Sequence, residues 1–227
     1  MYEFNTTFPW EYTLDPRPRF LLFGDSITQF SIRPLLHGFD TMLEAAYSRR
    51  VDVINRGLAG YTTRTGLGML PHIIDEWKDH KPSLMIVFFG ANDAILPTTP
   101  RFKALHVPLA EYVKNLKKIV QMSQTGFPEI KIVLVVPPPV DETRRHWRHN
   151  NVTSTYAKAC MDTAKELGLM GIDTFSIFQK QPNWHRLLLD GLHFSLEGHE
   201  LMYRVLQQHI VERFPEYDPK ILPQQYH

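Results

Sequence analysis

The sequence is poor in cysteine. Cys160 is the only cysteine among the 227 residues, so no disulfide can form within the chain. It falls in a stretch with helical apolar spacing, and no neighbouring residue is suited to activating its thiol. We therefore interpret Cys160 as a small core residue rather than as a nucleophile.

An excess of one charge and long apolar runs are also lacking. Lys and Arg total 25 against 24 for Asp and Glu, which gives no support to nucleic acid or an anionic membrane as a partner. No apolar run approaches the length of a membrane span. The first residues do not combine a basic start with an apolar core, so we expect no secretory signal. A soluble, cytoplasmic protein is the default expectation.

Metal-ligating clusters are scarce as well. His146 and His149 lie in the charged segment 141–150 (DETRRHWRHN), where the other features are mainly arginines, which repel cations. We therefore predict a solvated surface loop for this segment. We expect the protein to use no metal and no cofactor.

Short apolar runs alternate with amphipathic stretches along the chain. The apolar runs predict buried strands at 20–23, 51–54, 84–89 and 131–136, with a weaker strand at 171–178. Apolar residues spaced three or four apart predict helices at 34–50, 65–79, 108–124, 151–167 and 196–214. This alternation predicts an α/β fold with a five-stranded parallel sheet and helices on both of its faces.

The chain shows no change of composition that would divide it. We therefore predict a single domain over residues 1–227. Residues 1–18 are rich in aromatics and prolines without a period, and we expect an irregular segment that wraps the domain surface. Residues 215–227 have no pattern and are predicted to be an irregular tail.

Small polar residues follow three of the predicted strands. The segments are GDSIT (24–28), NRGLAG (55–60) and GAND (90–93). Because the carboxyl ends of parallel strands meet at one edge of a sheet, these segments are expected to lie together where α/β proteins bind ligands. Taken alone, Asp25, Ser26 and Thr28 favour a turn or a helix cap.

A fourth signal precedes the last predicted helix. Asp190 and His193 are three positions apart, a spacing at which a tight turn can bring the carboxylate against the imidazole. Acyl transfer needs a serine, a histidine that takes its proton and a carboxylate that fixes the histidine tautomer. It also needs donors for the developing oxyanion, which Asn92 and glycine N–H groups could supply. The combination of these signals, in this order, favours a nucleophilic serine.

These segments resemble the conserved blocks of the SGNH hydrolases, the GDSL-type esterases and lipases. GDSIT resembles the first block, with Ile27 in place of the usual leucine, and NRGLAG, GAND and DGLHFSLEGH (190–199) resemble the second, third and fifth. Within the family, FFGANDA, HVPLAEYVKNLKKIV and VVPPP are similar to isoamyl acetate-hydrolysing esterases. The absence of a G-x-S-x-G motif argues against an α/β-hydrolase.

The resemblance implies a fold and a set of site residues. The implied fold is a three-layer α/β/α sandwich, the flavodoxin-like SGNH hydrolase fold. Ser26 would be the nucleophile, His193 the base and Asp190 its orienting acid. The implied oxyanion hole consists of the Ser26 N–H, the Gly60 N–H and the Asn92 amide. The family also allows a homodimer.

The acyl side of the site is predicted from residues just beyond two strand ends. We expect a small apolar pocket that accepts short acyl chains, lined by Ala94, Ile95, Leu96, Pro138, Pro139 and Val140.

The leading hypothesis is a serine esterase that acts on small carboxylic esters, with a small-molecule ester as its substrate. A lysophospholipase, a thioesterase or a carbohydrate deacetylase could use the same site. A flavin-binding, flavodoxin-like module could cradle a phosphate with residues 26–31, but it leaves Asn92, Asp190 and His193 unexplained. A catalytically inactive binding domain is a third possibility, but every catalytic position of the family is filled in this sequence.

Overall fold

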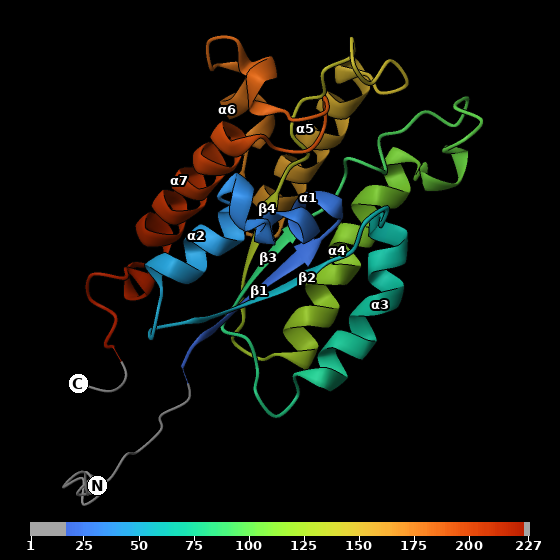
Figure 1. Ribbon diagram of the computed structural model, residues 1–227. Coiled ribbons are helices and arrows are strands. Elements are labelled where there is room, and N and C mark those ends of the chain that lie inside the picture. Colours follow the sequence, from blue (N-terminus) through green and yellow to red (C-terminus); the bar gives the residue numbers. More distant parts are fainter. Residues whose placement is uncertain (1–16, 225–227) are drawn as a thin grey trace, which may run out of the picture.

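The computed structural model describes residues 17–224 of the chain, and Figure 1 shows their arrangement. The predicted irregular segment 1–18 therefore lies outside the described residues, apart from Arg17 and Pro18. Among the described residues, no helix is both long and apolar enough to cross a membrane.

The predicted sheet is present, and all its strands are parallel. Its strands are β1 (Arg19–Gly24), β2 (Asp52–Gly57), β3 (Leu84–Phe88), β4 (Lys131–Val135) and β5 (Met170–Ile172), in the spatial order β2-β1-β3-β4-β5. Strand β1 thus lies between β2 and β3. After β1 the chain adds β2 on one side of it, and then crosses to add β3, β4 and β5 on the other side. A crevice forms at such a reversal of strand order, at the carboxyl ends of the strands.

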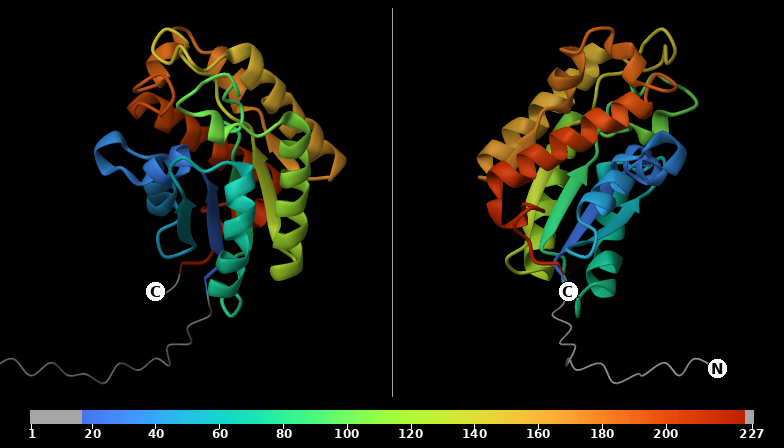
Figure 2. Two further views of the ribbon diagram at one scale, coloured as in Figure 1. Left: turned by 90° about the vertical axis from the view of Figure 1, so that its right-hand side faces the viewer. Right: turned by 60° about the vertical axis from the view of Figure 1, so that its left-hand side comes forward.

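Helices cover both faces of the sheet, which gives the expected α/β/α sandwich (Figures 1 and 2). The helices are α1 (Ser26–Gln29), α2 (Phe39–Ala46), α3 (Thr63–Glu76), α4 (Leu109–Gly126), α5 (Asn150–Glu166), α6 (Thr174–Gln179) and α7 (Leu196–Arg213). Short 3₁₀ turns occur at Phe30–Ile32, Pro34–Leu36, Lys103–Leu105, Trp184–Leu187 and Pro215–Tyr217. Helices α2 and α7 pack on one face, and α3, α4 and α5 pack on the other.

Alternate residues of the central strands enter the two cores. In β1, Phe20 and Leu22 pack toward α2 and α7, whereas Leu21 and Phe23 pack toward α3 and α4. All four are at most 1% exposed. Burial on both faces explains why β1 is a continuous apolar run instead of an alternating one.

The strand ends are level at the carboxyl edge. Gly24 is paired in register with Gly57 of β2 and with Phe88 of β3, and Phe88 is paired with Val135 of β4. The loops that follow these strands therefore start from one line across the sheet. This places the three polar segments side by side.

Two predicted elements differ from the structure. The strand predicted at 171–178 stops at Ile172, because Asp173 caps helix α6 by accepting a hydrogen bond from Ser176 N at 3.0 Å. The helix predicted at 34–50 forms only over Phe39–Ala46. At Gly38, an added Cβ would lie 1.7 Å from the carbonyl oxygen of Ser31, so the chain turns tightly there before the helix begins.

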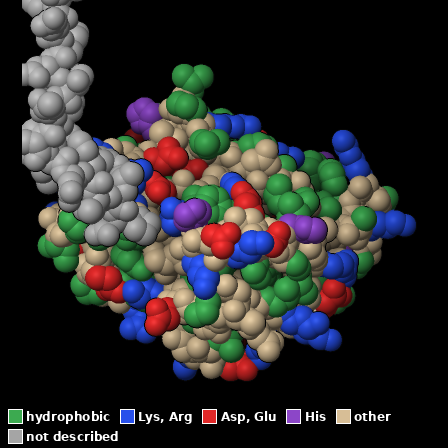
Figure 3. Space-filling view, turned by 90° about the horizontal axis from the view of Figure 1, so that it is seen from below, with side chains coloured by type: hydrophobic (Ala, Val, Ile, Leu, Met, Phe, Trp, Pro, Cys, Tyr) green, Lys and Arg blue, Asp and Glu red, His purple; other side chains and the backbone are tan. Residues whose placement is uncertain are grey.

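The described part of the C-terminal tail begins with an ordered turn. Tyr217, in the 3₁₀ turn Pro215–Tyr217, is 7% exposed and packs edge-on against Phe20 with the ring centroids 5.0 Å apart. This contact anchors the chain after α7 beneath the first strand. On the face seen in Figure 3, from below, basic and acidic side chains are interspersed, as the balanced charge predicts.

Candidate active site

Ser26 is the first residue of α1, directly after β1. The side chain of Asp25 caps this helix by accepting a hydrogen bond from Ile27 N at 2.9 Å. Gly24 has no room for a side chain, since a Cβ there would lie 2.2 Å from Thr28 Oγ1 and 2.5 Å from the Phe88 carbonyl oxygen. The strand and the helix therefore meet closely, and Ser26 is held at the carboxyl edge of the sheet.

Ser26, His193 and Asp190 form a continuous chain of hydrogen bonds. Ser26 Oγ is 2.9 Å from His193 Nε2, and His193 Nδ1 is 2.9 Å from Asp190 Oδ2. The carboxylate accepts only, so Nδ1 carries a proton and the neutral ring offers Nε2 to the serine as an acceptor. The structure thus brings the three predicted catalytic residues together in the required order.

The turn that holds Asp190 beneath His193 depends on Gly191. This glycine has a φ of 89°, in the region that residues with a side chain avoid. The turn lets Asp190 Oδ1 accept hydrogen bonds from the backbone N–H groups of Leu192 at 3.1 Å and His193 at 2.9 Å. The carboxylate is therefore fixed through one oxygen and orients the imidazole through the other.

The surroundings of His193 favour its neutral form. Burial lowers the pKa of His193, and the positive charges of Arg145 and Arg148 act in the same direction, while Asp190 opposes them. The pKa of Asp190 is itself lowered, because its hydrogen bonds with His193 and its attraction to His193 and Arg145 outweigh its burial. The Phe30 ring lies edge-on to the imidazole, with the centroids 5.1 Å apart.

The side chain of Asn92 is fixed at both ends of its amide. Nδ2 donates a hydrogen bond to the Tyr61 carbonyl oxygen at 2.9 Å, and Oδ1 accepts one from Arg148 Nη2 at 2.9 Å. Asp93 ties the same turn to the start of α3, because its Oδ1 accepts hydrogen bonds from the amide and the hydroxyl of Thr63. An amide nitrogen has two hydrogens, so Asn92 retains a second donor for a ligand.

The two backbone donors of the predicted oxyanion hole have different surroundings. Gly60 is exposed, has a φ of 79°, and would meet no atom within 4 Å if it carried a Cβ. The Ser26 N–H is in the first turn of α1, where backbone N–H groups have no partner within the helix. Gly57 is different: a Cβ there would lie 2.1 Å from Gln29 N, so this glycine allows β2 to approach α1.

The segment 141–150 was predicted to be a solvated loop, and for its key residues this is wrong. Arg148 is only 7% exposed and Asp141 only 5%. Arg148 donates hydrogen bonds to the Ala91 carbonyl oxygen and to Asn92, and Arg145 forms an ion pair with Asp190. The error arose because charged residues were interpreted as solvated, and no local pattern revealed that they pair with groups far away in the chain.

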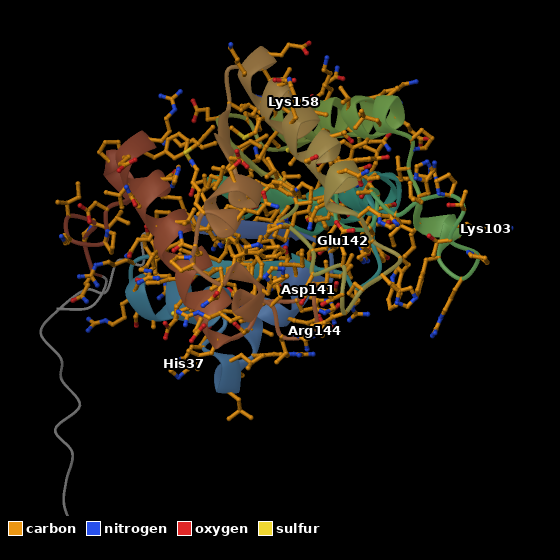
Figure 4. The ribbon with its side chains drawn as sticks, turned by 90° about the horizontal axis from the view of Figure 1, so that it is seen from above. His37, Lys103, Asp141, Glu142, Arg144 and Lys158 are labelled. Atoms are coloured by element: carbon orange, nitrogen blue, oxygen red, sulfur yellow. The ribbon has the colours of Figure 1, made fainter. Side chains whose placement is uncertain are left out.

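The same segment is joined to the Asp190 turn along its length. The Asp141 N–H donates to the Gly191 carbonyl oxygen at 2.9 Å, and Arg145 Nε donates to the Asp190 carbonyl oxygen at 3.0 Å. Figure 4, viewed from above, shows Asp141 and Arg144 near the middle of the face, whereas Lys103 lies far out on a neighbouring loop. Residues 141–148 therefore border both the histidine side and the asparagine side of the site.

A family model for GDSL-like lipases and acylhydrolases matches residues 22–201. The chain belongs to this family. A GDSL esterase/lipase of Arabidopsis thaliana is 39% identical over 82% of this chain and 83% of its own length. The human isoamyl acetate-hydrolyzing esterase 1 homolog is 36% identical over 91% of this chain and 86% of its own length. The resemblance predicted from the sequence is confirmed.

Solved structures support the fold of this GDSL-family chain. The lipase/acylhydrolase of Enterococcus faecalis superposes with a TM-score of 0.71 at 29% identity, covering 86% of this chain and 96% of that one. The acetylxylan esterase Axe2 of Geobacillus stearothermophilus gives a TM-score of 0.66 at 23% identity, over 85% of this chain and 94% of that one. Membership of the family makes the chain a carboxylic ester hydrolase.

The six predicted pocket residues of this GDSL-family chain differ in their burial. Ala94, Ile95, Pro138, Pro139 and Val140 are buried. Leu96 instead lines a cavity of about 590 Å³, whose walls also include Phe102 and Trp147 in a stacked pair with centroids 5.7 Å apart. The acyl pocket therefore stays a prediction.

Two further predictions concern residues outside the site. Cys160 is buried, and burial raises the pKa of its thiol to about 12, which agrees with its interpretation as a core residue. His146 is exposed, and His149 is 3.4 Å from Glu142. Across residues 17–224, no group of three or more His, Cys, Asp or Glu side chains is placed to hold a metal ion.

Proposed function

We propose that the chain hydrolyses small carboxylic esters with short acyl chains through an acyl-enzyme on Ser26. The observation that carries this proposal is the hydrogen-bonded series from Ser26 Oγ through His193 to Asp190. This series stands at the carboxyl edge of the sheet, beside an asparagine amide whose direction is fixed by two partners.

In the first half of the reaction, His193 Nε2 accepts the Ser26 proton as Oγ attacks the ester carbonyl carbon. The carbonyl oxygen becomes negatively charged, and the Ser26 N–H, the Gly60 N–H and the Asn92 amide stabilise it. When the tetrahedral intermediate collapses, the bond to the alcohol oxygen breaks, and the imidazolium gives its proton to the departing alcohol. The acyl group remains on Ser26.

In the second half, water takes the place of the alcohol. His193 accepts a proton from the water, whose oxygen attacks the acyl carbon and forms a second tetrahedral intermediate at the same hole. Its collapse breaks the bond to Ser26 Oγ, which recovers the proton from His193. A carboxylic acid leaves, and Asp190 keeps the imidazole in one orientation throughout both halves.

The identity of the relatives supports a small ester as substrate. The human relative named for isoamyl acetate hydrolysis is similar along 91% of this chain. The flavin-binding alternative has no supporting observation, since Ser26 and Thr28 lie in helix α1 and the Ser26 hydroxyl is bonded to His193. A lysophospholipase, a thioesterase or a carbohydrate deacetylase would use the same chemistry on a different acyl group.

The acyl-enzyme is tested by labelling with a fluorophosphonate. The probe should add once per chain, and peptide mapping should place it on Ser26. Ser26→Ala should abolish labelling and nearly all ester turnover, because no other hydroxyl is bonded to His193 among the described residues. Labelling of a different serine, or full turnover by Ser26→Ala, would refute the assignment.

The acyl-length preference is tested with p-nitrophenyl esters of increasing chain length. Each methylene that fits the site should favour binding by about 0.8 kcal/mol until the wall is reached. We expect kcat/KM to peak at short chains and then to fall. A steady rise out to long-chain esters would contradict the short-acyl proposal and favour a lipase.

A further inference from the structure

Arg148 is a buried arginine that takes no part in the proposed proton transfers. Its guanidinium lies behind Asn92, and the residue is 7% exposed. Nη2 donates to Asn92 Oδ1 at 2.9 Å, and Nη1 donates to the carbonyl oxygen of Ala91. Arg148 thus forms hydrogen bonds with two consecutive residues of the turn that carries the proposed oxyanion donor.

These contacts decide which way the Asn92 amide faces. A guanidinium is only a donor, and the Tyr61 carbonyl oxygen on the other side is only an acceptor. Rotating the amide by half a turn would set its NH₂ against Arg148 and its oxygen against Tyr61, so both hydrogen bonds would be lost. The observed orientation directs Nδ2 away from Arg148.

Burying a guanidinium is costly unless a carboxylate compensates for it. Burial lowers the pKa of Arg148 to about 10, partly opposed by the charges of Asp25 and Asp190, so the group is still charged at neutral pH. Asp25 precedes Ser26 and caps α1. The guanidinium therefore interacts with Asp25, which caps the helix of Ser26, and with Asp190, which orients His193. An apolar residue at position 148 would avoid the cost of burying a charge.

We propose that Arg148 is a positioning residue that holds the Asn92 amide in the orientation that donates to the oxyanion. This inference rests on the proposed function, because it needs an oxyanion at Asn92. The donor is required when the carbonyl oxygen becomes charged and hardly at all in the ground state. Loss of Arg148 should therefore lower kcat and leave KM nearly unchanged.

The experiment is a double-mutant cycle with Arg148→Met and Asn92→Ala, with kcat and KM measured on a p-nitrophenyl ester. Asn92→Ala should lower kcat by roughly 100- to 1,000-fold, as loss of an oxyanion donor does. Arg148→Met alone should lower it by roughly 10- to 100-fold, since a disoriented donor retains part of its effect. In the Asn92→Ala background, Arg148→Met should cost no more than about threefold, because the two residues act as one unit.

Arg148→Lys keeps the buried charge and serves as the second variant if Arg148→Met fails to fold. A lysine can donate to Ala91 or to Asn92 but lacks the paired donors, so kcat should fall with little change in KM or melting temperature. Equal losses from Arg148→Met in the wild-type and Asn92→Ala backgrounds would overturn the proposal, as would a wild-type kcat in Arg148→Lys. Ser26→Ala separates the two hypotheses: if Ser26 is required and the cycle is additive, only the role of Arg148 is refuted.

Discussion

Single side chains set the charge state of the proposed base. Asp190 Oδ2 accepts hydrogen bonds from both His193 Nδ1 and Arg145 Nη2, so the carboxylate is shared between an imidazole and a guanidinium. The guanidinium partly offsets the negative charge that would otherwise favour imidazolium. This arrangement fixes the ring without raising its pKa, and the net effect of the surroundings is a pKa of His193 below its usual value.

Arg145→Met should therefore move the acid limb of the activity profile. Catalysis needs neutral His193, so activity is present above the pKa of this group and is lost as the pH falls through it. Removing Arg145 raises that pKa, because a nearby positive charge disappears and Asp190 is no longer shared. The fall in kcat/KM should begin at a higher pH than in the wild type.

The control is Arg186→Met, which removes an arginine paired at 3.0 Å with Glu197 on the exposed surface. It should leave the acid limb in place. The measurement is kcat/KM on a neutral ester from pH 4 to 8 for all three proteins. An acid limb at the wild-type position, or at a lower pH, in Arg145→Met would show that Arg145 does not tune His193.

At the scale of secondary-structure elements, close contact between α1 and β2 is what places Ser26. This contact depends on Gly57, where a Cβ would lie 2.1 Å from Gln29 N and 2.6 Å from Gln29 Cα. Both atoms belong to the backbone, which cannot rotate aside as a flexible side chain could. Any side chain at residue 57 must therefore move α1 or β2.

Gly57→Ala should lower both stability and turnover, because α1 carries the proposed nucleophile, Ser26. We expect a loss of about 1–3 kcal/mol in the free energy of unfolding, typical of overpacking. The matched control is Gly68→Ala in α3, where a Cβ would meet nothing within 4 Å, and it should gain about 0.5–1 kcal/mol by helix propensity alone. Urea unfolding and ester turnover are measured for both variants, and a Gly57→Ala protein with wild-type values of each would contradict this account.

The sequence predicts some elements better than others, for identifiable reasons. The central strands were predicted correctly because burial on both faces leaves an uninterrupted apolar run, as in Phe20–Phe23. The end of β5 was predicted incorrectly, because the apolar residues of 174–178 suit a strand and a short helix equally. The helix is favoured by its N-cap, Asp173, whose side chain accepts a hydrogen bond from Ser176 N. This contact is known only from the structure.

At the scale of the whole molecule, sequence motifs predicted which residues form the triad. They did not predict the side chains that hold the neighbouring turns in place. The triad could be predicted, because the segments that carry Ser26, Asp190 and His193, each weak alone, together resemble the blocks of the GDSL family in the same order. Arg148 could not, because its partners Ala91 and Asn92 lie 57 and 56 residues away in the chain. A contact of that kind leaves no periodicity or spacing in the sequence, and it emerges only from the arrangement of the loops.

The hydrogen bond between Ser26 and His193 joins residues 167 positions apart, which has a consequence for biosynthesis. The proposed nucleophile Ser26, Asn92 and the segment 141–148 all leave the ribosome before the proposed base His193 does. A nascent chain that has not yet released His193 has no base for Ser26, however well its sheet has formed. Base-assisted attack on esters thus arises only after residue 193 has left the ribosome and docked beside Ser26.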